Sequence, residues 1–513
     1  MRHRVVLGLA ALTLALAACS PGSSSKSSAA SSPSTSTQPS SVTSAATPPA
    51  PGPAATVTNE ITGGKGINLA SASTGPSVPK GWVESEYAVE GTATSYSSAG
   101  PLPTDGQWTL HETADDPRAD QTTHAPYRTR IVVRRPAKAK DFNGTVVVEW
   151  LNVSGGLDAS PDYSYAKKEI LRTGTVWVGV SAQLIGIEGG AVAVPIKVAT
   201  DAGAGKGLRV LDPARYNDLH HPGDAFSYDI FTQVARALRA PKTVNPLGGL
   251  APKHVLAIGE SQSAFALTTY IDGVQPLTRE FDGFLVHSRG GAAAPLGSPG
   301  VGIDIAGTIS GAPTRLRTDL AAPILVLETE TDVLGILNYR PATQPDGLQL
   351  RIWEVAGTAH ADRYLVGTIG EQIGCPAPIN AGPGHFVVAA ALHALIRWVA
   401  DGVAPPRAPR LEIKGTAYSR DQFGNVKGGI RTPLVDVPVD TLSGESGGGS
   451  VACLLFGSTK PLTAVQLRAR YPSRAKYLAE YRAAADEAIK AGFVLPADRA
   501  ELLAAANPSR ITT

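Results

Sequence analysis

Residues 254–270 constrain the fold more strongly than any other part of the sequence. Residues 255–258 are apolar and predict a buried strand, whereas residues 264–270 are compatible with a helix. The turn between them reads Gly-Glu-Ser-Gln-Ser, which is the pattern G-x-S-x-G with Ser263 at the last glycine position. Small residues at 259 and 263 let the helix pass close to the strand. The turn then strains the backbone of Ser261 and projects its hydroxyl at the top of the sheet.

The motif is weak by itself, because the chain contains 54 glycines and many serines. A match of this kind is expected by chance about once, and the alternative interpretation is an ordinary turn. The context favours the functional interpretation. The flanking residues have strand and helix character, and an acid and a histidine follow Ser261 in suitable places.

The rest of the chain predicts alternating strands and helices from about residue 81 onward. Strands are predicted at residues 83–96, 108–110, 127–135, 144–150, 175–181, 281–287, 323–328 and 349–355. Helices are predicted at residues 163–172, 225–239 and 383–399, and residues 473–491 and 496–505 predict a C-terminal helical extension packed on the main domain. The pattern indicates an α/β fold with a mainly parallel central sheet, flanking helices and N-terminal strands. Residues 289–315, rich in Gly, Ala and Pro, predict a loop or lid.

A nucleophilic serine needs a neutral imidazole to accept its proton and a carboxylate to orient that imidazole. In a parallel sheet, the site lies beyond the carboxyl ends of the strands. Asp332 follows the strand that ends near residue 328, and His360 follows the last strand. We therefore predict Ser261 as nucleophile, His360 as base and Asp332 as acid.

Other residues of the right types compete for these roles. Glu330 is the alternative acid and His385 the alternative base, while Asp332 could instead cap a helix. His287, at a strand end, is interpreted as a structural histidine that could also line the pocket. For His220 and His221 we favour a loop over a metal site, because no carboxylate lies at a suitable spacing.

The oxyanion formed during attack on a carbonyl needs prearranged backbone N–H donors. One is expected from Gln262, the residue after the nucleophile. The second is expected from the Gly-rich loop that follows residues 144–150, and there we choose Val153. Asn152 could instead contribute its side chain or shape the turn.

Composition argues against several classes of function. The formal net charge is only +2, and we find no basic patch with interleaved aromatics, so nucleic-acid binding is not expected. There is no pair of C-x-x-C motifs, no P-loop and no convincing dinucleotide fingerprint. We therefore expect neither a metal nor an organic cofactor.

The N-terminus predicts export. Residues 1–18 carry Arg2 and Arg4 followed by an apolar run, which is typical of a signal peptide. They end in Leu-Ala-Ala before Cys19, which resembles the bacterial lipoprotein cleavage box, where the cysteine is acylated. The alternative is a plain secretory signal.

Residues 19–57, rich in Ser, Thr, Pro and Ala, predict a disordered linker, and residues 58–513 predict the folded domain. The expected location is the outer face of the cell membrane, through a lipid anchor.

Several longer segments carry a family likeness. They are residues 149–156 (EWLNVSGG), 259–264 (GESQSA), 287–290 (HSRG), 353–362 (WEVAGTAHAD), 374–380 (GCPAPIN), 397–406 (RWVADGVAPP), 423–431 (FGNVKGGIR) and 453–457 (CLLFG). Over roughly residues 80–513 the chain resembles the α/β-hydrolase superfamily, and within it a group of bacterial exported α/β-hydrolase-domain proteins whose substrates are mostly unassigned. Ser263 departs from the glycine usual in the superfamily but fits this group.

The resemblance implies an α/β-hydrolase fold and a Ser/acid/His mechanism in the chain order Ser261, Asp332, His360. It implies no substrate. Cys375 and Cys453 lie in two of the shared segments, and a disulfide between them is the expectation for an exported chain. The alternative is two buried thiols.

These observations predict a serine hydrolase that cleaves a small-molecule or lipid-like carboxylic ester through an acyl-enzyme. An acyltransferase or amidase would use the same three residues. The alternative from another class is a non-catalytic surface binding lipoprotein on a hydrolase fold, which would be free to lose Ser261 or His360. The sequence carries no signal for an oligomeric state.

Overall fold

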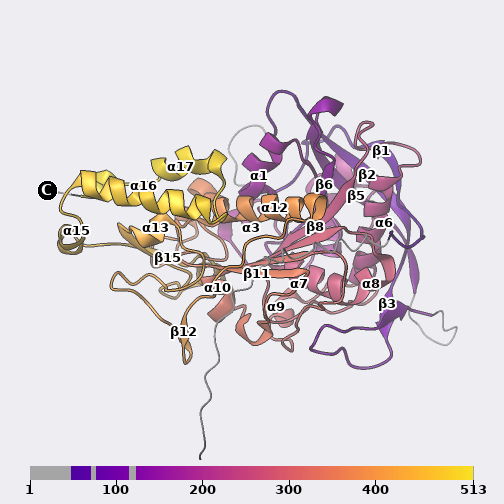
Figure 1. Ribbon diagram of the computed structural model, residues 1–513. Helices are drawn as coiled ribbons and strands as arrows, with labels where there is room; N and C mark the ends of the chain where they lie inside the picture. Colours follow the sequence, from indigo (N-terminus) through magenta and orange to yellow (C-terminus); the bar gives the residue numbers. More distant parts are fainter. Residues whose placement is uncertain (1–47, 71–76, 115–122, 512–513) are drawn as a thin grey trace, which may run out of the picture. The chain divides into compact units, whose positions relative to one another are not determined.

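The computed structural model describes residues 48–70, 77–114 and 123–511 (Figure 1). The predicted signal peptide, Cys19 and most of the predicted linker therefore lie outside the described residues. No helix within the described ranges is long and apolar enough to cross a membrane.

A nine-stranded sheet forms the centre of the described part of the chain. In spatial order its strands are β1 (Thr56–Glu60), β2 (Trp82–Thr94), β5 (His124–Pro136), β7 (Val176–Val180), β6 (Thr145–Trp150), β8 (His254–Glu260), β9 (Gly283–His287), β10 (Ile324–Thr329) and β11 (Leu350–Val355). The pairings from β1 to β7 are antiparallel, and those from β7 to β11 are parallel. The predicted mainly parallel sheet is confirmed.

Helices cover both faces of the sheet. Successive residues of a strand point to opposite faces, so each buried strand offers apolar side chains to the helices on both sides. Val146 and Val148 of β6 belong to the apolar cluster that includes α6 (Ser227–Arg239) and α7 (Gln262–Thr269). Val147 belongs to the opposite cluster, with α1 (Pro161–Thr173) and α12 (Gly384–Asp401). Burial on both faces explains the continuous apolar runs that predicted these strands.

The C-terminal extension packs on the main domain through α12. Ala485 and Ala488 of α16 (Arg474–Lys490) share an apolar cluster with Phe386 of α12 and with Leu502 of α17 (Arg499–Ala504). Figure 1 shows these two helices in yellow beside the orange α12. A hydrogen bond of 3.0 Å between Arg172 Nη2 and Asp498 Oδ2 adds a polar contact to α1.

The folded part begins earlier than predicted. The linker was expected to extend to residue 57, but β1 starts at Thr56 and pairs with β2. The Ala50 N–H donates to the Thr278 carbonyl at 2.7 Å, and Ala55 and Val57 are buried. Composition does not report strand pairing, which uses backbone groups, and residues 56–60 (TVTNE) pair with β2 in this way.

Candidate active site

The turn between β8 and α7 holds Ser261 in the conformation expected of a strained nucleophile. Its φ and ψ angles are 61° and −124°, in a region that non-glycine residues avoid. The Ser261 N–H donates to the His287 carbonyl of β9 at 3.0 Å, which ties the turn to the neighbouring strand. A Cβ at Gly259 would lie 3.0 Å from the Ser263 Cβ, so small residues at both positions are required.

Three side chains from separate loops form a continuous hydrogen-bonded series. His360 Nε2 lies 2.8 Å from Ser261 Oγ, and His360 Nδ1 lies 2.7 Å from Asp332 Oδ1. Ser261 follows β8, Asp332 follows β10 and His360 follows β11, so the carboxyl ends of three parallel strands bring them together. With the proton on Nδ1, the imidazole donates to Asp332 and can accept the serine hydroxyl proton at Nε2.

Asp332 also takes part in capping a helix, the role that was considered as its alternative, although the N-cap residue itself is Thr329. It is the third residue of α10 (Glu330–Leu334), and its Oδ2 accepts from Thr329 N–H at 2.6 Å and Thr329 Oγ1 at 2.7 Å in a capping box. Burial opposes its ionisation, but His360 and these hydrogen bonds outweigh that effect and lower the pKa of Asp332. One oxygen therefore fixes the helix end and the other faces the imidazole.

His360 lies between two carboxylates. Burial disfavours its protonated form, but Glu260 and Asp332 outweigh burial and raise the pKa of His360. Glu260 Oε1 lies 3.2 Å from His360 Nε2. Sequence reasoning did not assign Glu260 any role, because the second position of G-x-S-x-G has no required side chain.

The competing acid and base lie elsewhere. The carboxylate of Glu330 accepts from Gly357 N–H at 2.6 Å and Gly444 N–H at 2.9 Å, and burial raises its pKa to about 7. His385 stacks on Tyr364 with ring centroids 3.8 Å apart and lies 3.5 Å from Glu501 of α17. Neither side chain takes part in the series that contains Ser261.

Two other histidines considered from the sequence, His287 and His221, have structural contacts. His287 is buried, and its Nδ1 lies 2.7 Å from Asp162 Oδ1. Burial opposes protonation of His287, but the hydrogen bond and charge of Asp162 outweigh it and raise the pKa. His221 Nε2 lies 2.9 Å from the Ala182 carbonyl. Among the described residues no group of three or more His, Cys, Asp or Glu side chains is arranged to hold a metal ion.

The segments that carry the two predicted oxyanion donors meet at the elbow. Gln262 is the first residue of α7, so its N–H has no acceptor within the helix. The Val153 loop is tied to the elbow by Asn152, whose Nδ2 donates to the Glu260 carbonyl at 3.1 Å and whose Oδ1 accepts from Ser154 N–H at 2.9 Å. Within the described residues neither the Gln262 N–H nor the Val153 N–H has a hydrogen-bond partner.

A cavity of about 460 Å³ opens beside Ser261. Its lining is mainly aliphatic and comes from five separate parts of the chain: Leu69, Leu157, Val194, Ile196, Val198, Leu365, Val366, Ile369, Leu455 and Phe456. Glu260 and His360 are the only Asp, Glu, Lys, Arg or His residues among the described residues that line it. The predicted lid at residues 289–315 does not contribute to this lining. Residues 194–202, which include α3 (Lys197–Asp201), lie there instead.

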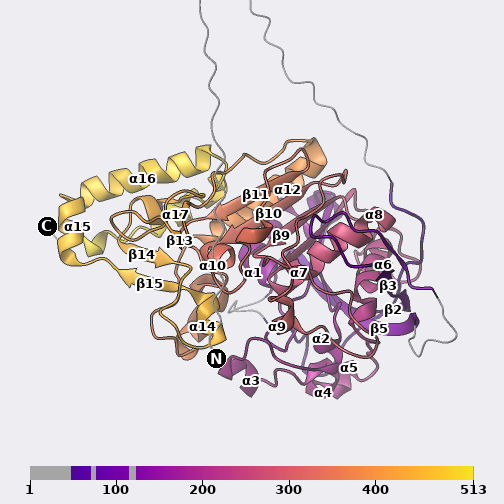
Figure 2. The same ribbon diagram turned by 90° about the horizontal axis from the view of Figure 1, so that it is seen from below.

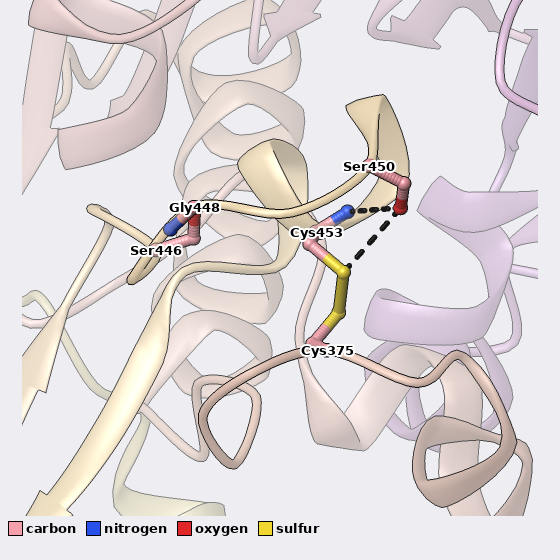
Figure 3. Close-up of a disulfide and its surroundings, with 5 residues drawn as sticks. All are labelled: Cys375, Ser446, Gly448, Ser450 and Cys453. Atoms are coloured by element: carbon pink, nitrogen blue, oxygen red, sulfur yellow. Dashed lines mark hydrogen bonds between the residues drawn. A yellow bond between two sulfur atoms is a disulfide. The ribbon is translucent and has the colours of Figure 1, made fainter.

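The predicted disulfide between Cys375 and Cys453 is confirmed (Figure 3). Cys375 and Cys453 are 78 positions apart, with Cα atoms separated by 5.4 Å. Cys453 belongs to α14 (Val451–Phe456), which supplies Leu455 and Phe456 to the cavity. Figure 2 shows α14 and α3 at the same edge of the domain, where their segments share an apolar cluster. The bond therefore ties α14, which supplies part of the wall, to the segment that follows the wall residues 365–369.

The fold and the elbow define an α/β protein of the hydrolase type. A sequence model described as "alpha/beta hydrolase domain" matches residues 50–504. The chain therefore belongs to the alpha/beta hydrolase domain family. No curated protein sequence matches it.

Three solved structures illustrate its similarity to known proteins. An esterase from Rhizomucor miehei is 11% identical, with 61% of this chain and 85% of that chain covered and a TM-score of 0.29. Esterase B from Lactobacillus rhamnosis is 11% identical (63% and 89% covered, TM-score 0.27). An α/β serine hydrolase without a lid from Xanthomonas campestris is 11% identical (50% and 86% covered, TM-score 0.25). At these scores the likenesses carry no argument about function.

Proposed function

We propose that the protein is a serine hydrolase that cleaves carboxylic esters. The observation that carries this proposal is the hydrogen-bonded series Ser261–His360–Asp332 at the edge of an apolar cavity. A strained serine backbone costs free energy, on the order of 1–3 kcal/mol, and such strain clusters at functional sites. A protein that only binds its ligand has no need of this combination.

In the proposed reaction, Ser261 Oγ attacks the ester carbonyl while His360 Nε2 accepts its proton. Asp332 stabilises the imidazolium that forms, and the N–H groups of Gln262 and Val153 stabilise the oxyanion. His360 then protonates the leaving alcohol, and an acyl-enzyme remains. Water, deprotonated by His360, attacks the acyl-enzyme. The imidazolium then returns the proton to Ser261 Oγ as the bond to the acyl group breaks and the acid is released. An acyltransferase would follow the same steps with another alcohol in place of water.

The cavity supports an uncharged, small-molecule or lipid-like ester as substrate. Its volume of about 460 Å³ falls within the range of small-molecule sites. Its lining is mainly aliphatic and includes neither Lys nor Arg from the described residues, so no permanently charged cation there would pair with an anionic acyl group.

Hydrolysis of p-nitrophenyl esters, from acetate to palmitate, tests the proposal. We compare the full-length protein with Ser261→Ala and with Ser263→Ala, a matched control two positions away in the same turn. Loss of activity in Ser261→Ala alone, with the fold retained by circular dichroism, would support Ser261 as the nucleophile. Equal background rates in all three proteins, together with no labelling of Ser261 by a fluorophosphonate probe, would contradict the proposal.

We also propose that the mature protein is exported and anchored through a lipid on Cys19. The support is the charged, apolar and small-residue pattern of residues 1–19. Intact-mass analysis of the membrane fraction should show a lipid-modified N-terminus at Cys19. Cys19→Ala should release the protein from the membrane, and unchanged membrane association in that variant would contradict the anchor.

A further inference from the structure

The carboxyl group of Glu260 lies between the proposed base and the loop that carries an oxyanion donor. Its Oε1 is 3.2 Å from His360 Nε2, and its Oε2 accepts from Asn152 Nδ2 at 3.2 Å. The Asn152 amide also donates to the Glu260 carbonyl, as described above. Glu260 is buried and lines the substrate cavity. One side chain thus contacts two parts of the proposed catalytic machinery that approach from opposite sides.

Several ionisable groups face Glu260 from the elements around it. His360 and Asp332 come from the loops after β11 and β10, His287 from β9, and Asp162 and Tyr165 from α1. Glu260 and His287 are direct neighbours in the parallel register of β8 and β9. Burial raises the pKa of Glu260 to about 7, while the two histidines oppose this rise. The carboxyl group therefore changes charge in the neutral range.

The contact between Glu260 Oε1 and His360 Nε2 is attractive only when one of the two atoms carries a proton. In the proposed reaction, Nε2 gains that proton as the serine attacks. At that moment the imidazolium has Asp332 beside Nδ1 and Glu260 beside Nε2. In the free protein the same carboxylate favours protonation of His360 and so reduces the fraction of neutral base at acidic pH.

We propose that Glu260 is a positioning residue that stabilises protonated His360 by its charge and holds the oxyanion loop against the elbow through Asn152. This inference rests on the proposed function for its catalytic meaning, but the charge coupling can be measured without turnover. The two contributions are separable, because the first needs a negative charge and the second needs only an acceptor for the Asn152 amide.

The variants Glu260→Gln and Glu260→Asp separate them. Gln keeps the length of the side chain and an acceptor for Asn152 but removes the charge, whereas Asp keeps the charge on a shorter side chain. The first measurement is the pH dependence of kcat/KM for p-nitrophenyl butyrate between pH 5 and 9. At acidic pH, kcat/KM falls; we call this part of the profile the acidic limb. In the wild type the limb reflects titration of the coupled Glu260–His360 pair, and in Glu260→Gln it reflects titration of His360 alone.

We expect the acidic limb of Glu260→Gln to move to lower pH by about one unit, because an adjacent anion that raised the pKa of His360 is gone. Its kcat on the plateau should fall about tenfold, because the imidazolium loses part of its stabilisation. Glu260→Asp should keep the limb close to that of the wild type. A purely structural role would lower the plateau in both variants and leave both limbs in place, which would overturn the inference.

An NMR titration of the His360 imidazole reads the same coupling in the absence of any substrate. The resonance is identified by its loss in His360→Asn, and thermal unfolding confirms that each variant is folded. A lower pKa of His360 in Glu260→Gln than in the wild type supports the inference even if no ester is hydrolysed. An unchanged pKa overturns it even if the protein is an active esterase. Failure of the proposed function appears separately, as absence of turnover and of fluorophosphonate labelling in the wild type.

Discussion

Among the described residues, two buried Asp–His pairs lie at the same edge of the sheet, and one of the two contacts a serine side chain. In Asp332–His360 and in Asp162–His287, the Nδ1···Oδ1 distance is 2.7 Å. All four side chains are buried. The two pairs differ in what surrounds the rest of the imidazole ring. His360 Nε2 lies 2.8 Å from Ser261 Oγ, whereas the ring of His287 packs edge-on against Tyr165 with centroids 5.7 Å apart.

An Asp–His pair can act as a base only where the second ring nitrogen lies beside a nucleophile at the edge of a cavity. His360 lines the apolar cavity, and His287 does not. His287 supports the same nucleophile through its backbone, because its carbonyl accepts from the Ser261 N–H. The Asp332–His360 pair therefore suits the proposed chemistry, whereas the Asp162–His287 pair connects α1 to β9.

The largest expected contrast is in activity when each histidine is replaced. His360→Asn should lower kcat for ester hydrolysis by about 10⁶-fold, because the serine loses its proton acceptor. His287→Asn should lower it by less than about tenfold, because its carbonyl and the strand remain. Stopped-flow and steady-state assays on the same p-nitrophenyl ester measure both. Comparable losses in the two folded variants would break the distinction between the pairs.

Replacing the acids gives the next contrast. Asp332→Asn should lower kcat by about 10⁴-fold, as expected when the imidazole loses its orienting carboxylate. Asn at this position can still accept from Thr329, so the capping box and the fold should persist. Asp162→Asn provides the control from the other pair. A greater loss of kcat in Asp162→Asn than in Asp332→Asn would reverse the assignment.

The loss of stability should be larger for His287→Asn than for His360→Asn, which is the opposite of the order expected for activity. Asp332 keeps two hydrogen bonds from Thr329 when His360 is removed, whereas Asp162 Oδ2 has no hydrogen-bond partner among the described residues. His287→Asn should therefore lower the free energy of unfolding by about 3 kcal/mol, the scale for an uncompensated buried charge. His360→Asn should cost less. Urea unfolding of both variants measures the difference, and a larger cost for His360→Asn would contradict this account.

The smallest expected effect is the change with pH in the free energy of unfolding that His287→Asn removes. Because the pKa of His287 is raised in the folded protein, its protonation stabilises the fold fully below the unfolded pKa of about 6.5. That contribution disappears as the pH rises through the higher folded pKa. The destabilisation by His287→Asn should thus be greater at pH 5.5 than at pH 9. Urea unfolding at the two pH values tests this sign, and an equal cost at both would show that charge does not hold the pair.

Much of the fold and part of the site were predictable because their determinants are local in sequence. Small residues at 259 and 263 predicted the tight crossing that the structure shows between β8 and α7. Apolar runs predicted the buried strands, and their order predicted which loops meet at the carboxyl edge. The structure brings Ser261, Asp332 and His360 into contact there, while their catalytic roles stay predictions.

Other choices depended on partners that sequence patterns do not reveal. Asp332 and Glu330 follow the same strand two residues apart, and the hydrogen bonds to Gly357 and Gly444 turn Glu330 away from the imidazole. The cavity wall comes from residues 194–202 and from α14 rather than from residues 289–315.

The sequence by itself therefore determined the elbow and the mainly parallel sheet, because turn sterics and hydrophobic periodicity act over a few residues. Only the tertiary structure decided which histidine faces the serine, which acid faces that histidine, and that Glu260 lies beside both. These contacts join segments about 30 to 100 positions apart, and packing of the whole domain, rather than any local pattern, sets their distances.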